Sequence, residues 1–136
     1  MKHRSIVSVI AVATILAACS SSDNPVSYPN SEASYKQADA EVGCASKYSD
    51  TKKDDLFASK YKDHWMTWSG EVVLAESESA ALNLDGVGTQ DLSVEFADKK
   101  AGYDLKKGEV IKVKFLMKNA GGCFLPFAGE QAVIVK

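Results

Sequence analysis

Apolar and polar residues alternate with a period of two through most of the second half of the chain. The clearest runs begin at Trp65, at Leu92 and at Ile111, where every second residue is apolar. Successive side chains of a β-strand point to opposite faces, so this period indicates strands with one buried face. Further strand-like segments are 81–85, 124–127 and 132–135. The pattern predicts an antiparallel sheet of five or six strands.

A long insertion at 98–108 separates the third strand from the fourth, and this spacing is typical of an OB-like barrel. Gly70 lies inside the first run, where a barrel strand bends sharply and glycine tolerates the bend. Upstream, residues 49–61 begin with good capping residues and early acids, which indicate a helix. We therefore expect residues 37–136 to form a mostly β domain: a small five- to six-stranded antiparallel OB-like barrel with one N-terminal helix.

The stretch 61–135 resembles the small periplasmic and lipoprotein OB-like domains. The resemblance covers about half of the chain, and its motifs are those of many small barrels. Most members of that group are uncharacterised, so the resemblance implies a fold and no particular activity. The matching residues are Trp68, Gly70, Val72, Leu105, Gly108, Ile111 and Val113.

Residues 1–18 have the layout of a secretory signal peptide, with Lys2 and Arg4 ahead of an apolar run at 6–18. That run is shorter than the roughly 20 apolar residues that a membrane-spanning helix needs. Its end, 16–19 (Leu-Ala-Ala-Cys), resembles the lipobox of bacterial lipoproteins. The resemblance implies cleavage before Cys19 and lipidation of its thiol. The alternative is an ordinary signal peptide, with Cys19 a bystander.

Residues 19–36 are rich in Ser, Asn and Pro and have no apolar period, so we expect a lipidated flexible tether. Ser20 follows the lipobox cysteine and resembles the outer-membrane default of Gram-negative lipoproteins. The expected location is the cell envelope, with the lipid in the outer membrane and the domain facing the periplasm. The anchor makes the membrane itself the first expected partner.

Cys44 and Cys123 remain once Cys19 carries a lipid, and an even pair in an oxidising compartment predicts a disulfide. The alternatives are a redox pair or a metal site with His64. The chain has no C-x-x-C motif and no ligand-like spacing, so we predict no metal and no cofactor.

The charge of the chain argues against nucleic acid as a partner. The net charge is −2, and cleavage removes Lys2 and Arg4, so two positive charges are lost and −4 remains. Affinity for nucleic acid depends on neutralising phosphates with cations. We therefore expect a protein or a glycan as the partner.

His64 is the one histidine left after cleavage, and the chain has no G-x-S-x-G motif. We predict no catalytic residues. Lys112, Lys114 and Leu116 fall on the predicted outward face of the fourth strand, which makes them a candidate interaction surface. The alternative for the lysines is a solvated strand whose charges oppose aggregation.

The leading hypothesis is a non-enzymatic envelope lipoprotein whose OB-like domain binds a protein or glycan. A second hypothesis is an inhibitor or exclusion factor that acts against a lysozyme-like enzyme or a phage. A third is an envelope hydrolase that uses a serine and His64.

Overall fold

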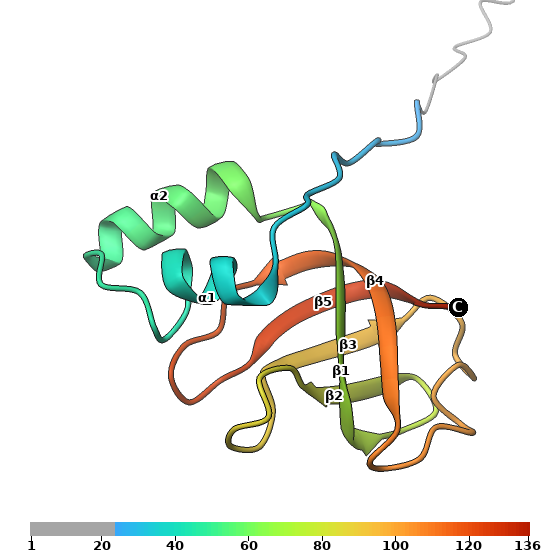
Figure 1. Cartoon of the computed structure of the whole chain (residues 1–136). Coiled ribbons are helices and arrows are strands. Elements are labelled where there is room, and N and C mark those ends of the chain that lie inside the picture. The colour runs from blue at the N-terminus through green and yellow to red at the C-terminus, as the bar shows by residue number, and fades with distance from the viewer. Residues whose placement is uncertain (1–23) are drawn as a thin grey trace, which may run out of the picture.

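The computed structural model describes residues 24–136, which form a closed barrel with two short helices against it (Figure 1). Cys19 and the predicted signal peptide lie outside the described residues. The elements are α1 (Tyr35–Val42), α2 (Asp50–Lys60), β1 (Trp65–Ala75), β2 (Ser79–Asn83), β3 (Leu92–Phe96), β4 (Val110–Asn119) and β5 (Phe127–Val135).

The strands form a closed barrel in the order β1-β2-β3-β5-β4, and β4 pairs with β1 to complete it. The predicted mostly β fold and small barrel are confirmed. The expectation of a wholly antiparallel sheet is wrong, because β3 pairs with β5 in parallel. Strand direction cannot alternate at every step around a closed ring of five strands, so one neighbouring pair must run the same way.

Two helices precede the barrel where the sequence indicated one. Ser49 caps α2, and its side chain accepts a hydrogen bond from the backbone N–H of Lys52. The additional helix, α1, is capped in the same way by Ser34, which accepts from the N–H of Gln37. Both helices lie on the same side of the barrel (Figure 1).

The segment ahead of α1 pairs with the barrel through its backbone. Asn30 forms a parallel bridge with Trp65. The N–H of Trp65 donates to the carbonyl of Pro29 at 2.8 Å, and the N–H of Ser31 donates to the carbonyl of Trp65 at 2.9 Å. Folded structure therefore begins before residue 37, and part of the predicted tether 19–36 is attached to β1.

The core is aromatic at the end of the barrel that α1 covers. Trp68, Phe115 and Phe127 pack edge to face, and Tyr35 of α1 contacts both Trp68 and Phe127. The ring centroids of Trp68 and Phe115 lie 5.3 Å apart, within the usual range for aromatic pairs. Trp68, Phe96 and Phe115 are all buried, so each lies on the inward face of its alternating strand.

Candidate binding surfaces

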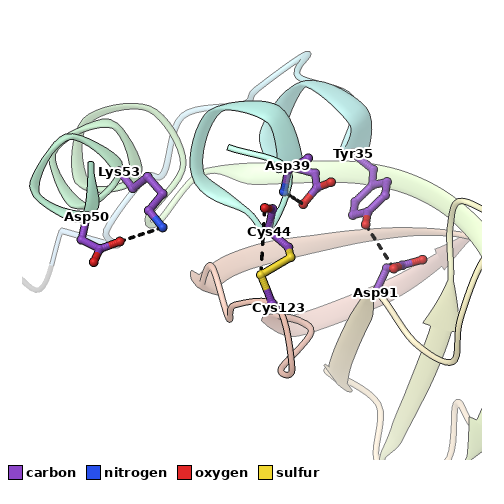
Figure 2. The surroundings of a disulfide bond; sticks show 8 residues. Tyr35, Asp39, Cys44, Asp50, Lys53, Asp91 and Cys123 are labelled. Atoms are coloured by element: carbon purple, nitrogen blue, oxygen red, sulfur yellow. Dashed lines mark hydrogen bonds and ion pairs between the residues drawn. A yellow bond between two sulfur atoms is a disulfide. The ribbon is translucent and has the colours of Figure 1, made fainter. Parts of the chain in front are cut away.

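The predicted disulfide joins Cys44, just after α1, to Cys123 in the loop between β4 and β5 (Figure 2). The two Cα atoms are 4.5 Å apart. The bond spans 79 residues of sequence, so it ties the helical part of the chain to the last loop of the barrel.

The disulfide loop, 120–126, carries two of the most exposed apolar side chains of the described chain. Phe124 is 100% exposed and Leu125 is 70% exposed. The predicted strand at 124–127 is wrong for its first three residues, because β5 begins only at Phe127. The apolar residues Phe124 and Leu125 therefore belong to an exposed loop, which Cys123 attaches to Cys44 through the disulfide.

Lys112 and Lys114 are exposed on the outer side of the barrel, as predicted. They lie directly across from Val135 and Val133 of β5. The ammonium group of Lys114 sits 5.5 Å from the centre of the Trp65 ring, a cation–π contact.

Three exposed valines accompany these lysines on the same outer surface. Val110 is 71% exposed and Val133 is 55% exposed, and Val135 is also exposed. We call this surface the β4–β5 face, and its members are Val110, Lys112, Lys114, Val133 and Val135.

The expectation for Leu116 is wrong, because its side chain is fully buried. Leu116 lies opposite Trp65 of β1 in an unbroken register, so it keeps the outward position of the alternation, and it is not part of the core cluster of the barrel. Phe115, Leu116 and Met117 are consecutive and all buried. Trp65, the neighbour of Leu116, pairs with the segment 29–31 on the outside of the barrel, and the pattern of a single strand does not reveal burial beside such a distant segment.

His64 lies between α2 and β1, and its Nδ1 is 2.9 Å from the carbonyl oxygen of Lys62. Its backbone carbonyl accepts a hydrogen bond from the N–H of Met117. The neighbouring Asp63 is paired with Lys118 at 2.8 Å, and this contact holds the pKa of Asp63 below its usual value. No hydrogen bond in residues 24–136 joins the His64 ring to a serine or a carboxylate.

A pocket of about 560 Å³ opens between α1, β1 and the loop from β2 to β3. We call it the α1 pocket. Its apolar wall comprises Tyr35, Trp68 and Leu84. Its polar rim comprises Lys36, Asp39, Thr67, Ser69 and Asp85.

Asp91 connects the two sides of the α1 pocket. One carboxylate oxygen accepts a hydrogen bond from the Tyr35 hydroxyl at 3.1 Å (Figure 2). The other accepts from the backbone N–H groups of Leu84, at 2.7 Å, and Asp85, at 3.2 Å. Burial, followed by the negative charges of Asp39 and Asp91, raises the pKa of Tyr35 well above its usual value. The hydroxyl therefore stays protonated and keeps donating to Asp91.

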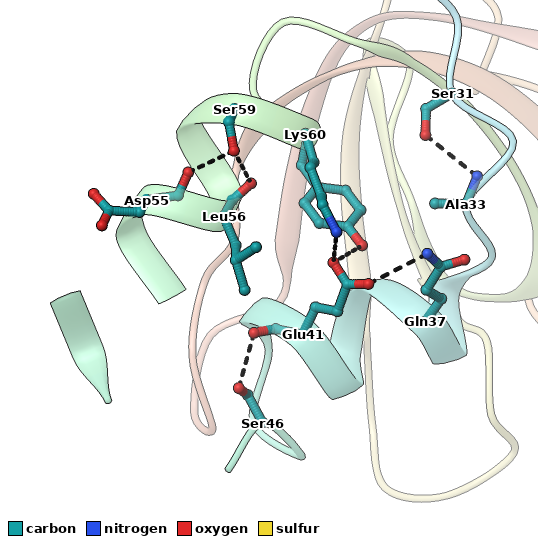
Figure 3. Close-up of polar contacts among 10 residues, drawn as sticks. Ser31, Ala33, Gln37, Glu41, Ser46, Asp55, Leu56, Ser59 and Lys60 are labelled. Atoms are coloured by element: carbon teal, nitrogen blue, oxygen red, sulfur yellow. Dashed lines mark hydrogen bonds and ion pairs between the residues drawn. The ribbon is translucent and has the colours of Figure 1, made fainter. Parts of the chain in front are cut away.

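A second polar cluster, centred on Glu41, holds the two helices together (Figure 3). Its carboxylate accepts from Tyr61 at 2.9 Å, from Lys60 at 3.2 Å and from Gln37 at 3.3 Å. Burial opposes the charge on Glu41, but these hydrogen bonds outweigh that effect and lower its pKa. The cluster is part of the framework that keeps α1 in place beside the pocket.

Two kinds of site are absent from the described part of the chain. Within residues 24–136, no three His, Cys, Asp or Glu side chains gather closely enough to hold a metal ion. None of the helices in that range has the length and apolar character needed to cross a bilayer. The chain has no significant match among protein-family models, curated proteins or solved structures.

Proposed function

We propose that the chain is a lipid-anchored protein of the bacterial cell envelope whose OB-like barrel binds a protein or glycan without catalysing a reaction. The lipobox-like segment ending at Cys19 supports the anchor. The strand order β1-β2-β3-β5-β4, with β3 and β5 parallel, supports the OB-like description, since that fold is a five-stranded Greek-key barrel.

The observation that carries the binding function is the β4–β5 face. A closed barrel has few unpaired edges, so its partners must be met by side chains on its outer surface. Val110, Val133 and Val135 expose apolar area there, and Lys112 and Lys114 add positive charge. Apolar side chains grouped on a surface and bordered by polar residues are typical of an interaction site.

The binding function is tested by site-specific photocrosslinking in cells that make the full-length lipoprotein. A benzophenone amino acid at Val133 reports on the β4–β5 face, and the same amino acid at Tyr103 provides the control. Tyr103 lies outside this face and is the more exposed of the two positions, at 76% against 55% for Val133. We expect a discrete crosslinked product from position 133 and none from position 103. The proposal fails if position 133 gives no product, or if both positions give the same products.

The anchor is tested separately with the Cys19→Ser variant. We expect the parent protein to incorporate labelled palmitate and to remain with the membrane fraction. The variant should lose the label and enter the soluble fraction, because the thiol that would carry the lipid is gone. Equal labelling of both proteins would contradict the assignment of Cys19.

A second candidate function, inhibition of a lysozyme-like enzyme, is favoured by the disulfide loop. Phe124 and Leu125 project from a loop that the Cys44–Cys123 bond fixes to the helices. A rigid loop loses little conformational entropy on binding, which suits insertion into the cleft of an enzyme.

The inhibitor function is tested by titrating the purified lipoprotein into a lysozyme-type muramidase assay. We expect Phe124→Ser to weaken inhibition by at least about tenfold, since a central aromatic residue often dominates binding. Tyr103→Ser removes an exposed aromatic residue elsewhere and serves as the matched control. Absence of inhibition by the parent protein would exclude this candidate for the enzyme tested.

A further inference from the structure

The α1 pocket combines an apolar wall with a polar rim. Tyr35 and Leu84, with Trp68 behind them, supply an apolar wall, and Thr67 and Ser69 supply hydroxyl groups from β1. The volume of about 560 Å³ lies within the range of small-molecule sites, roughly 300–1,000 Å³. A wall of this kind beside convergent polar groups is the usual form of a ligand site.

The polar rim has the donor and acceptor balance that hydroxyl groups require. Asp39 and Asp85 accept hydrogen bonds, Lys36 donates them, and the hydroxyls of Thr67 and Ser69 do both. A sugar ring presents C–H groups on its faces and hydroxyls around its edge. The apolar wall can pack against the C–H faces of the sugar, and the polar rim can hydrogen-bond its hydroxyls.

The charge of the rim selects among saccharides. The pocket lining carries two carboxylates, Asp39 and Asp85, and one ammonium group, Lys36, and the carboxylate of Asp91 holds the wall residue Tyr35. Lys112 and Lys114 lie opposite Ser69 and Thr67 on the neighbouring strand, outside the lining. An anionic sugar would meet a site of the same sign, which raises the free energy of the bound state. The rim therefore favours a neutral saccharide.

The pocket is organised before any ligand arrives. Asp91 holds the Tyr35 hydroxyl on one side and the backbone of Leu84 and Asp85 on the other. Wall and rim are thus fixed relative to each other by one carboxylate. Such preorganisation reduces the entropy lost when a ligand binds.

From this arrangement we propose that the α1 pocket is a binding site for a neutral saccharide. The inference rests on the proposed envelope function and assigns its glycan partner to a defined place. The α1 pocket borders the β4–β5 face, because Thr67 and Ser69 lie opposite Lys114 and Lys112. The two proposals are therefore distinguished by their readouts, amide signals around Tyr35 and Leu84 for the sugar and a crosslink at Val133 for the protein partner.

The test is an NMR titration of the full-length lipoprotein in detergent micelles with chitotriose, maltotriose and cellotriose. The reporters are the amide signals of Tyr35, Leu84 and Asp85 and the indole N–H signal of Trp68. Sugar concentrations up to about 10 mM detect binding even when the dissociation constant is near the millimolar range. Trigalacturonic acid, a trisaccharide of similar size with three carboxylates, tests the charge preference.

Two variants on β1 provide matched controls. Ser69→Phe places a bulky side chain inside the pocket, whereas Glu71→Phe places the same group on the same outward face of the strand but outside the pocket lining. Both positions are exposed, so neither change alters the barrel core.

We expect at least one neutral trisaccharide to shift the four reporters in the parent protein and in Glu71→Phe. Ser69→Phe should reduce the affinity at least tenfold, and trigalacturonic acid should leave the reporters unmoved. The proposal is overturned if no neutral sugar moves the reporters, if Ser69→Phe binds as well as the parent, or if the acidic sugar binds equally. In each of these cases the crosslinking result at Val133 still decides whether the protein is a binding module.

Discussion

The indole Nε1 of Trp68 donates a hydrogen bond of 2.8 Å to the backbone carbonyl of Ala33. Trp68 belongs to β1, and Ala33 lies just ahead of α1. The bond therefore fastens the helical segment to the aromatic end of the barrel core. Trp68 serves at once as a core residue, a wall of the α1 pocket and the attachment point for the segment that covers it.

The Trp68→Phe variant tests this attachment. The change removes buried volume and leaves the carbonyl of Ala33 without its donor, so we expect unfolding to require about 2–3 kcal/mol less free energy. Urea denaturation followed by circular dichroism measures the loss. Trp65→Phe is the control: Trp65 is only partly buried, and its change should cost less than about 1 kcal/mol. Equal losses for the two variants would contradict the assigned role of Trp68.

The Cys44–Cys123 bond should contribute strongly to stability. Because it closes a span of 79 residues, the chain-entropy argument gives an upper value of about 4.5 kcal/mol. We expect the Cys44→Ser/Cys123→Ser variant to unfold at a much lower urea concentration than the oxidised parent. Reduction of the parent with dithiothreitol should give the same midpoint as the double variant. A midpoint unchanged by reduction would show that the bond does not restrict the unfolded chain.

Glu41 should make the fold sensitive to acid. Its pKa is lower in the folded protein than in the unfolded chain, where the pKa of a glutamate is about 4.3. Its contribution is therefore complete above that value and is lost as the pH falls through the lower, folded pKa. We expect Glu41→Gln to unfold more easily than the parent at pH 7 and to differ less from it at pH 3. Thermal melts across this range measure the difference, and a constant difference would contradict the interpretation.

Gly129 should not tolerate a side chain. A Cβ atom at this position would overlap the ring of Phe115, which is fully buried and cannot move aside easily. We expect Gly129→Ala to destabilise the protein by about 2 kcal/mol, the usual size of an overpacking effect. Gly122→Ala is the matched control, because a Cβ there meets no atom within 4 Å. Similar melting temperatures for the two variants would show that β5 shifts to accommodate the methyl group.

The sequence was most informative where side-chain burial alternates without interruption. From Met66 to Val72 every second residue of β1 is buried, so the inward face could be read directly from the order of residues. The same rule failed at Leu116, which keeps the outward position opposite Trp65 but is nevertheless buried. Burial on the outer side of a sheet depends on what packs there, which the sequence of one strand does not show.

Other features were missed because they depend on contacts between distant segments. The attachment of Asn30 to Trp65 uses backbone groups, which leave no trace in the side-chain pattern. The α1 pocket brings Tyr35 together with Leu84 and Asp85, about fifty residues later in the chain. The disulfide was predictable because the sequence predicts export, and two cysteines left in an oxidising compartment normally pair.

The pairing of Asn30 with Trp65 also limits how far the barrel can move. With the lipid on Cys19, as proposed, the anchor is ten residue steps from Pro29, where the backbone joins the barrel. A chain of that length reaches roughly 35 Å when fully extended. The barrel would therefore remain within about its own width of the bilayer. It would meet only partners close to the membrane surface, and molecules farther from the membrane would be out of its reach.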